Sequence, residues 1–356
     1  MTKIKLAYMV LLAGAVFGLL FALLIKAGNP ANMGVCVACF TRDIAGALRL
    51  HRVDAVSYLR PEILGFILGS CAIALATREF RATGGSAPLL RFILGGFMMI
   101  GALAFLGCPN RMIGRLAGGD WTALAGLLGF AAGIFIGTLG LRRGFSLGRA
   151  RPQGRAAGMV LPILAAVLVA ALLVKPAFIF FAEKGHAAWY LSIGAGLLIG
   201  ILGQRARLCF AGGFRDLFIM GDTHLFQGIL AFGLAILITN LALGQFHAGA
   251  TPIAHSAHLA GFLGMALVGL CAVLLGGCPF RQTIMAGNGS GDAGLAVLGM
   301  IAGAACAHNF LLAAKPDAVT EAGVRTVGGI SGAGYTAVIA GLVICLVVGF
   351  TSRTAE

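Results

Sequence analysis

The hydrophobic residues of this chain are gathered into long uncharged runs. A helix needs about 20 apolar residues to cross the roughly 30 Å hydrocarbon layer of a membrane. Runs of that length are Leu6–Ile25, Trp121–Leu141, Phe226–Phe246 and Leu259–Phe280, and shorter or interrupted runs occupy residues 61–77, 89–107, 158–182, 187–204, 293–314 and 332–351. With 59% hydrophobic residues, 11% charged residues and a mean hydropathy of +0.98, the chain is too apolar for a soluble domain. We predict an all-α polytopic membrane protein with about 9–10 transmembrane segments.

Residues that end helices interrupt several of these runs. The breaks are Gly28-Asn29-Pro30, Gly107-Cys108-Pro109, Gly203-Gln204-Arg205 and Gly277-Cys278-Pro279. Backbone groups that are freed in lipid survive only where they line a cavity or are buried in protein. Paired breaks in two halves of a membrane protein mark a site near the middle of the bilayer. We therefore predict short re-entrant helices at these places.

Two motifs built on cysteine each occur twice, about 170 residues apart. The block Gly107-Cys108-Pro109-Asn110-Arg111 recurs as Gly277-Cys278-Pro279-Phe280-Arg281. The pattern Cys-x-Ala-x3-Arg-Asp begins at Cys36 and again at Cys209. Because both motifs recur in the same order and at nearly the same offset, the sequence indicates a duplication.

The duplication divides a single transmembrane domain, residues 1–356, into two repeats. Repeat one covers residues 6–141 and repeat two residues 187–314, with a linking helix at 156–182 and a final helix at 332–351. An odd number of spanning segments separates the starts of the repeats. The second copy is then upside down relative to the first, which predicts an inverted-topology repeat.

The charge of the chain is strongly positive, at +14 with 26 basic residues. A nucleic-acid partner is excluded because there is no soluble module to hold it. The loop at 142–155 carries five arginines and no acid, which places it in the cytoplasm together with both chain ends. Six arginines then lie toward the opposite face and need another explanation, namely Arg42, Arg49, Arg52, Arg60, Arg111 and Arg115.

The Gly-Cys-Pro blocks suggest an anion site. Proline favours the first position of a helix, so Pro109 and Pro279 place Cys108 and Cys278 at helix caps. A helix N-terminus attracts anions, and one turn further on the motif carries Arg111 in one copy and Arg281 in the other. The alternative is that these cysteines only fill space at a helix crossing.

The second motif supplies further candidates. Cys36 and Cys209 are its shared thiols, and Cys39 forms a Cys-x-x-Cys in the first copy only. The Arg-Asp dipeptides either form ion pairs that pin the re-entrant segments or contact the substrate, because charges in a membrane are costly unless paired; they are Arg42-Asp43 and Arg215-Asp216. No further ligands follow at zinc spacing and no nucleotide or haem motif occurs, so we expect neither metal nor cofactor.

These motifs resemble the YeeE/YedE family of bacterial inner-membrane proteins, and most of all its YedE selenium-transport branch. The resemblance runs from the Cys36 motif to about His308. It implies an inverted-repeat helical bundle that imports a small sulfur- or selenium-containing anion such as thiosulfate. It also implies that Cys108, Cys278 and one thiol of the Cys36-x-x-Cys39 stretch pass the anion along through S–H···S hydrogen bonds. A separate sulfur-carrier protein of the TusA type is an implied partner.

Three functions remain open from the sequence. The first is a transporter or channel, without enzymatic activity, in which arginines and helix ends attract the anion. The second is a membrane thiol oxidoreductase or sulfurtransferase with Cys108 or Cys278 as nucleophile. The third is a scaffold for a sulfur carrier, docked on the loop at 142–155.

Overall fold

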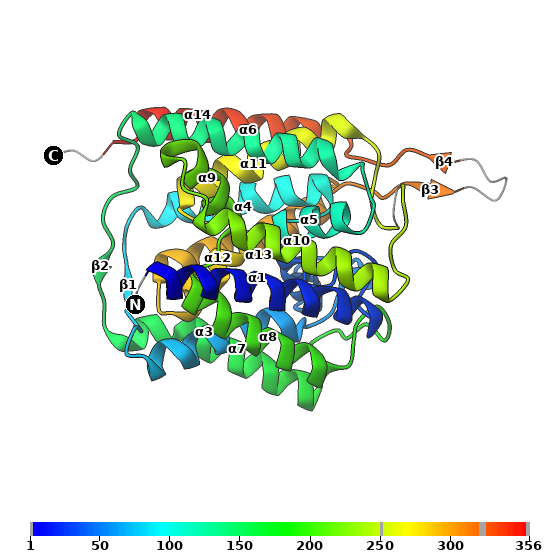
Figure 1. The fold of residues 1–356 in the computed structure, drawn as a ribbon, viewed down its shortest axis with the longest axis horizontal. Coiled ribbons are helices and arrows are strands. Elements are labelled where there is room, and N and C mark those ends of the chain that lie inside the picture. Colours follow the sequence, from blue (N-terminus) through cyan, green and yellow to red (C-terminus); the bar gives the residue numbers. More distant parts are fainter. Residues whose placement is uncertain (1–2, 250–251, 320–324, 354–356) are drawn as a thin grey trace.

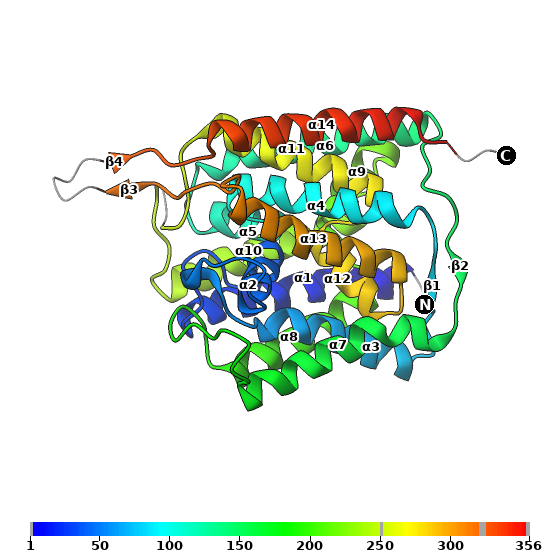
Figure 2. The ribbon, with the colours of Figure 1, turned by 180° about the vertical axis from the view of Figure 1, so that it is seen from behind.

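The structure is a computed structural model that describes residues 3–249, 252–319 and 325–353, and most of its helices run side by side (Figures 1 and 2). The helices are α1 (Lys3–Lys26), α2 (Val37–Ala47), α3 (Pro61–Ala76), α4 (Pro88–Phe105), α5 (Pro109–Ala117), α6 (Ala123–Arg142), α7 (Arg155–Val174), α8 (Trp189–Ala206), α9 (Phe210–Met220), α10 (His224–Ala242), α11 (His258–Leu275), α12 (Pro279–Gly287), α13 (Gly291–Asn309) and α14 (Gly332–Thr351), with a 3-10 turn at Asp54–Val56. Two antiparallel ladders join β1 (Thr83–Gly84) to β2 (Arg151–Pro152) and β3 (Ala318–Val319) to β4 (Arg325–Thr326).

The prediction of an all-α polytopic membrane protein is confirmed. Within the described ranges, 10 helical segments are long and apolar enough to cross a membrane. The four helices α2, α5, α9 and α12 have only 9 to 11 residues each. At 1.5 Å per residue, a helix of that length reaches about halfway across the hydrocarbon layer.

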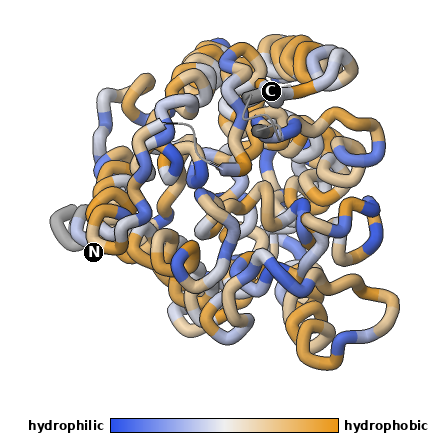
Figure 3. The backbone as a smooth tube through the Cα atoms, turned by 90° about the vertical axis from the view of Figure 1, so that its right-hand side faces the viewer, coloured by the Kyte–Doolittle hydropathy of each residue, from blue (hydrophilic) through white to orange (hydrophobic). Residues whose placement is uncertain are grey.

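The outer helices present large apolar side chains to their surroundings. On α7 these are Val160, Ile163 and Val167, and α10 and α14 carry similar rows. Seen along the helices, the tube is mostly in the hydrophobic colour (Figure 3). A surface of this kind is stable in contact with lipid chains rather than with water.

The main helix pairs connect the two halves of the chain through close-packed glycines. The pairs are α1 with α10, α3 with α8, α4 with α13, and α6 with α11. A Cβ atom added at Gly133 of α6 would strike the carbonyl of Ala266 on α11, and one added at Gly14 of α1 would strike that of Gly228 on α10. Small residues four apart allow helix backbones in a membrane to approach in this way. Each half therefore packs mainly on the other half rather than on itself.

The two described chain ends lie at the same end of the bundle (Figure 1). The loop that contains β2 reaches the same end, where β1 pairs with β2 and the Ser146 N–H donates to the carbonyl of Ser352 at 3.3 Å. The arginine-rich loop and both chain ends thus share one side, as predicted. We call this side the basic end and the opposite side, which carries β3 and β4, the hairpin end.

Most arginines at the hairpin end are explained by ion pairs. Four of the six predicted there pair with carboxylates, namely Arg42 and Arg60 with Asp43, Arg49 with Asp54, and Arg115 with Asp120. Arg52 is exposed. Arg111 is fully buried, and no carboxylate of the described chain forms an ion pair with it.

Two helices end earlier than predicted. The linking helix was expected to reach residue 182, but α7 ends at Val174 because Lys175 adopts a left-handed conformation with φ of 51° and Pro176 follows. The run at 293–314 was expected to be helical throughout, but α13 ends at Asn309 and Leu311 has φ of 56°. The sequence analysis also did not predict the short β ladders.

The glycine contacts make a testable prediction for stability. Replacing Gly133 with leucine forces α6 away from α11, and we expect a loss of about 1–3 kcal/mol, as for other overpacked sites. The midpoint of thermal unfolding in detergent measures the loss. Gly194→Leu is the matched control, since Gly194 lies on α8 with no atom within 4 Å of an added Cβ. Equal midpoints for the two variants would contradict this account of helix packing.

Candidate functional site

Four cysteines from the duplicated motifs each cap a short helix. Cys36 precedes α2, Cys108 precedes α5, Cys209 precedes α9 and Cys278 precedes α12. Proline occupies the first turn after Cys108 and Cys278, as the sequence predicts. The other two caps were not predicted. In both, the cysteine sulfur accepts a hydrogen bond from the backbone N–H three residues on, at 3.4 Å for Cys36 and 3.2 Å for Cys209.

The four caps meet in two pairs. The sulfur atoms of Cys36 and Cys108 are 3.6 Å apart, and those of Cys209 and Cys278 are 3.8 Å apart. We call them the first and the second thiol pair. Each pair joins one cysteine from each motif of the same half of the chain. All four residues are buried, with at most 6% of the surface of any one exposed.

The geometry of the pairs concentrates positive potential. A helix N-terminus carries roughly half a positive charge, and two such termini meet at each thiol pair. The Cys36 sulfur donates a weak S–H hydrogen bond to that of Cys108.

Arg111 reaches the first thiol pair from α5. Its Nη1 atom donates to the sulfur of Cys39 at 3.6 Å and to the carbonyl of Leu106, and its Nη2 atom donates to the carbonyl of Ile253 at 2.7 Å. Its Nε atom is buried and has no hydrogen-bond partner in the described structure. A fully buried guanidinium without a carboxylate is costly, so this corner of the molecule is suited to an anion.

The second thiol pair has a sparser surrounding. Arg281 lies one turn after Cys278, and its Nη1 atom donates to the carbonyl of Gly203 at 3.5 Å. Its side chain is partly accessible, and no ion pair involves it among the described residues. Gly212 stands where the first half has Cys39, so the second pair lacks a third thiol.

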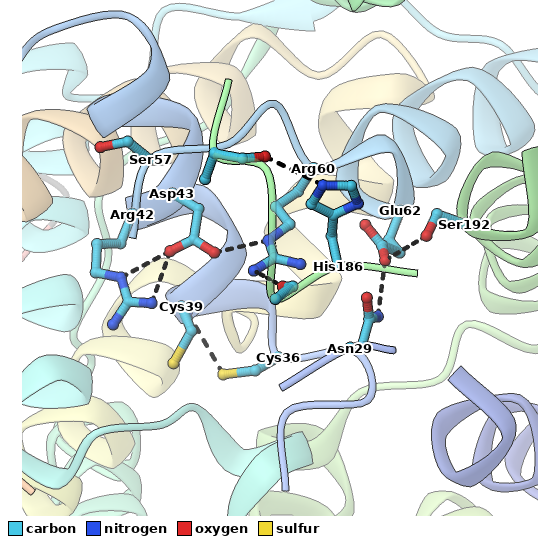
Figure 4. A network of polar contacts seen from close by, with 12 residues as sticks. Asn29, Cys36, Cys39, Arg42, Asp43, Ser57, Arg60, Glu62, His186 and Ser192 are labelled. Atoms are coloured by element: carbon cyan, nitrogen blue, oxygen red, sulfur yellow. Dashed lines mark hydrogen bonds and ion pairs between the residues drawn. The ribbon is translucent and has the colours of Figure 1, made fainter. Parts of the chain in front are cut away.

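The two Arg-Asp dipeptides differ in their partners. Asp43 pairs with its neighbour Arg42 at 2.6 Å and also with Arg60 at 2.6 Å, which ties α2 to the start of α3 (Figure 4). Burial disfavours the charged carboxylate, but these two guanidiniums outweigh it and hold the pKa of Asp43 below its usual value. Arg215 pairs with Asp216 at 2.8 Å in a partly exposed position, and no third charge joins it among the described residues.

A cluster of phenylalanine rings includes the residues beside the second thiol pair and was missed by the sequence analysis. Phe17 of α1 is its centre, with ring centroids 5.1 Å from Phe280 and 6.2 Å from Phe210, the residues that follow the Pro279 and Cys209 positions. Phe21, one turn along α1, faces Gly114 of α5 on the side of the first pair. The rings are fully buried. The spacing of Phe17 and Phe21 on one helix face was the only available signal.

The remaining cysteines lie apart from these pairs. Cys271 of α11 and Cys345 of α14 have their sulfur atoms 3.4 Å apart, Cys71 is buried, and Cys306 is exposed. Among the residues that the structure describes, no group of three or more histidine, cysteine or acidic side chains could hold a metal ion.

Comparison with known proteins identifies relatives for part of the chain. A family model described as "Sulphur transport" matches residues 205–356, which include the second thiol pair and Arg281. Two proteins named "Thiosulfate transporter TsuA" are similar, one from Escherichia coli at 35% identity over 100 residues and one from Spirochaeta thermophila at 33% over 107. A protein named "Probable transporter YedE" from Salmonella typhimurium is 37% identical over 94 residues.

These similarities cover only part of each protein. The matched segments make up 26%, 29% and 26% of this chain and 27%, 31% and 21% of the respective relatives. Thiosulfate transporters and the YedE protein match at similar identities. The family model thus matches the C-terminal part of the chain, and the named relatives are similar to it over 94 to 107 residues.

Proposed function

We propose that this chain transports a small sulfur-containing anion, of the thiosulfate type, across the inner membrane of a bacterium. The observation that supports this most directly is the presence of two thiol pairs. Each joins two helix N-termini, and each lies near an arginine that no described carboxylate neutralises. The names of the relatives agree with transport.

The thiols suit a soft anion better than a hard one. A neutral S–H group donates weakly, and its sulfur is polarizable, so it binds a terminal sulfur atom more readily than it binds sulfate or phosphate oxygens. In our proposal the anion passes from one thiol pair to the other by exchanging hydrogen bonds, without a covalent intermediate. We further propose that the phenylalanine cluster around Phe17 forms the barrier between the two pairs, and that its rings move when the anion crosses.

In our proposal each half of the chain provides one thiol pair, and the two pairs face opposite sides of the membrane. We propose that repeat one (residues 6–141) and repeat two (187–314) are related by an inverted two-fold arrangement. The exchanged helix pairs support it, because α1 packs on α10 as α8 packs on α3. The first thiol pair then serves the hairpin end and the second serves the basic end, which by the positive-inside rule faces the cytoplasm.

The finer parts of this proposal concern substrate and partner. A selenium anion of similar size and charge is the second candidate substrate, supported by the similarity to YedE. A TusA-type sulfur carrier is a candidate partner at the basic end. The loop at 142–155 supports it with exposed arginines that include Arg143, Arg149 and Arg151.

The enzymatic alternative makes a different demand on the same residues. A thiol oxidoreductase or sulfurtransferase needs a low-pKa thiolate that attacks sulfur. In that alternative the nucleophile is Cys108 or Cys278. The closeness of the thiol pairs is the observation in favour, since sulfur atoms 3.6 Å apart need little movement to form a disulfide.

Uptake by purified protein in proteoliposomes tests the proposal. We expect the wild-type protein to take up labelled thiosulfate, with labelled selenite as the second substrate. The Cys108→Ser, Cys278→Ser double variant should lose most of this uptake, because the thiol partner on each side is removed. The matched control is Cys271→Ser, Cys345→Ser, which alters a buried thiol pair outside the two sites and should retain wild-type uptake.

The same preparation separates transport from thiol chemistry. A persulfide or selenyl-sulfide adduct on Cys108 or Cys278, detected by mass spectrometry after turnover, would favour the enzymatic alternative. Folded wild-type protein that takes up neither anion would refute the transporter proposal.

Substitution of the two buried arginines on α5 should affect transport in one case and stability in the other. Arg111→Met removes an uncompensated buried charge, so we expect unchanged or raised stability but at least tenfold weaker uptake, equivalent to about 1.4 kcal/mol. Arg115→Met breaks the fully buried ion pair with Asp120 and should lower stability by about 3–5 kcal/mol. Thermal unfolding and uptake measure the two effects, and equal loss of stability in both variants would contradict the assignment of Arg111.

A further inference from the structure

A buried acid close to the loop before Cys36 has no cationic partner among the residues that the structure describes. Glu62, in the first turn of α3, is 0% exposed, and it forms no ion pair within the described ranges. Its Oε1 atom accepts hydrogen bonds from Asn29 and from Ser192, both at 2.8 Å. Its Oε2 atom is buried and has no hydrogen-bond partner in the part of the chain that the structure describes. Figure 4 shows this group beside the Arg42–Asp43–Arg60 cluster.

The orientation of Asn29 fixes where a proton can be held. The Asn29 side-chain oxygen accepts from the N–H of Ala187 at 2.8 Å, and its Nδ2 atom donates both to Glu62 and to the carbonyl of Gly34. The amide is therefore not free to turn. With donors already occupying Oε1, the vacant Oε2 is the atom that a proton would occupy. An unpaired carboxylate oxygen in this setting is unfavourable, and protonation removes the charge.

A metal cation fits this place less well than a proton. Hard cations require several oxygen ligands, whereas the two described groups that contact Glu62 donate hydrogen atoms toward it. No metal-binding group of three or more such side chains occurs in the described chain. A proton needs only the one free oxygen.

Glu62 is connected to the first thiol pair through the backbone. Asn29 donates to Gly34 at 2.8 Å, and Gly34 lies two residues before Cys36, which caps α2. A Cβ atom added at Gly34 would strike the backbone of Phe21, so this loop is tightly held. In this inference, a change of charge at Glu62 acts on Cys36 through this loop.

The charges around the first thiol pair match a dianion only when Glu62 is neutral. The cluster contains Arg42, Arg60 and Arg111 against the carboxylates of Asp43 and Glu62. An ionised Glu62 leaves one net positive charge, and a protonated Glu62 leaves two. We propose that Glu62 is a proton-binding site that takes up one proton when a divalent sulfur anion binds beside Cys36. This inference rests on the proposed function.

The coupling has a definite sign. If the anion favours protonation of Glu62, protonation favours the anion by the same factor. Anion binding is then tightest at low pH and weakens as pH rises, by up to about tenfold per pH unit where one proton is linked. In transport, each anion enters with a proton.

The effect of Glu62 on the pH dependence of anion binding must be distinguished from that of the other titratable groups around it. The ring of His186 stacks on Tyr58 with centroids 4.0 Å apart, beside a cavity of about 380 Å³. The charged or titratable groups on the surrounding elements include Lys26 at the end of α1, Arg42 and Asp43 on α2, Tyr58 and Arg60 before α3, Arg155 on α7, Lys175, Glu183 and His186 between α7 and α8, Tyr190 and Arg205 on α8, and Arg281 on α12.

Titration calorimetry with thiosulfate on the purified full chain tests the inference. Binding to wild-type protein, measured in two buffers of different ionisation heat, should show uptake of about one proton per anion. The dissociation constant should rise as the pH rises, by up to about tenfold per pH unit where one proton is linked. Glu62→Gln mimics the neutral acid, so it should bind tightly at low and at high pH and take up no proton.

Two matched variants serve as controls. His186→Gln removes the neighbouring imidazole, and Glu79→Gln removes an acid that pairs with Arg205 near the basic end. Both should keep the pH dependence of the wild type. A size-exclusion profile and a thermal unfolding midpoint establish that each variant is folded.

The possible results lead to different conclusions. Wild-type binding without proton uptake overturns this inference and leaves the proposed function standing. The inference is also overturned if anion binding still depends on pH in Glu62→Gln, or if that dependence is lost in His186→Gln. Absence of thiosulfate binding and uptake by folded wild-type protein overturns the proposed function, and this inference with it. If Glu62→Gln does not fold, the wild-type proton count still decides.

Discussion

The site depends on one constraint, namely that a helix which begins inside a membrane must satisfy its first N–H groups without water. Cysteine meets this constraint in an unusual way. The sulfur atoms of Cys36 and Cys209 accept N–H bonds at the starts of α2 and α9, whereas Pro109 and Pro279 remove one N–H from the starts of α5 and α12. The capping group and the group available to a ligand are therefore the same thiol. This explains how two positive helix ends can meet at each pair without a permanent anion.

The two halves have diverged around this shared framework. The first thiol pair is surrounded by a third thiol at Cys39, a fully buried Arg111 and the Asp43–Arg60 ion pair. The second has Gly212 in place of Cys39 and an arginine that is partly accessible. Stronger and more deeply buried charge favours capture of an anion, and a sparser surrounding favours its release. An importer that loads at the hairpin end and unloads at the basic end would benefit from this difference.

Much of this arrangement could be predicted from the sequence, and the limits are physical. The long apolar runs and the Cys-Pro breaks predicted the spanning helices and the caps of α5 and α12, because these depend on local chain properties. The caps at Cys36 and Cys209 were missed because a thiol is a rare substitute for serine or aspartate at that position. The phenylalanine cluster and the Glu62 group bring together residues from several distant helices. Only tertiary packing places Ser192 beside Glu62, 130 positions earlier in the chain.

Proton binding at Glu62, as we propose it, would lower the electrical cost of moving a negatively charged substrate. The sequence contains no nucleotide-binding motif, and moving an anion into a negatively charged interior costs about 2.3 kcal/mol per charge for each 100 mV. A dianion carries that cost twice, and one accompanying proton removes half of it. The helix ends and Arg111 can attract the anion, but they remain in the protein and cannot offset the charge that crosses. In our proposal a proton taken up at Glu62 offsets that charge, which gives a physical reason for a buried acid that pairs with no cation among the described residues.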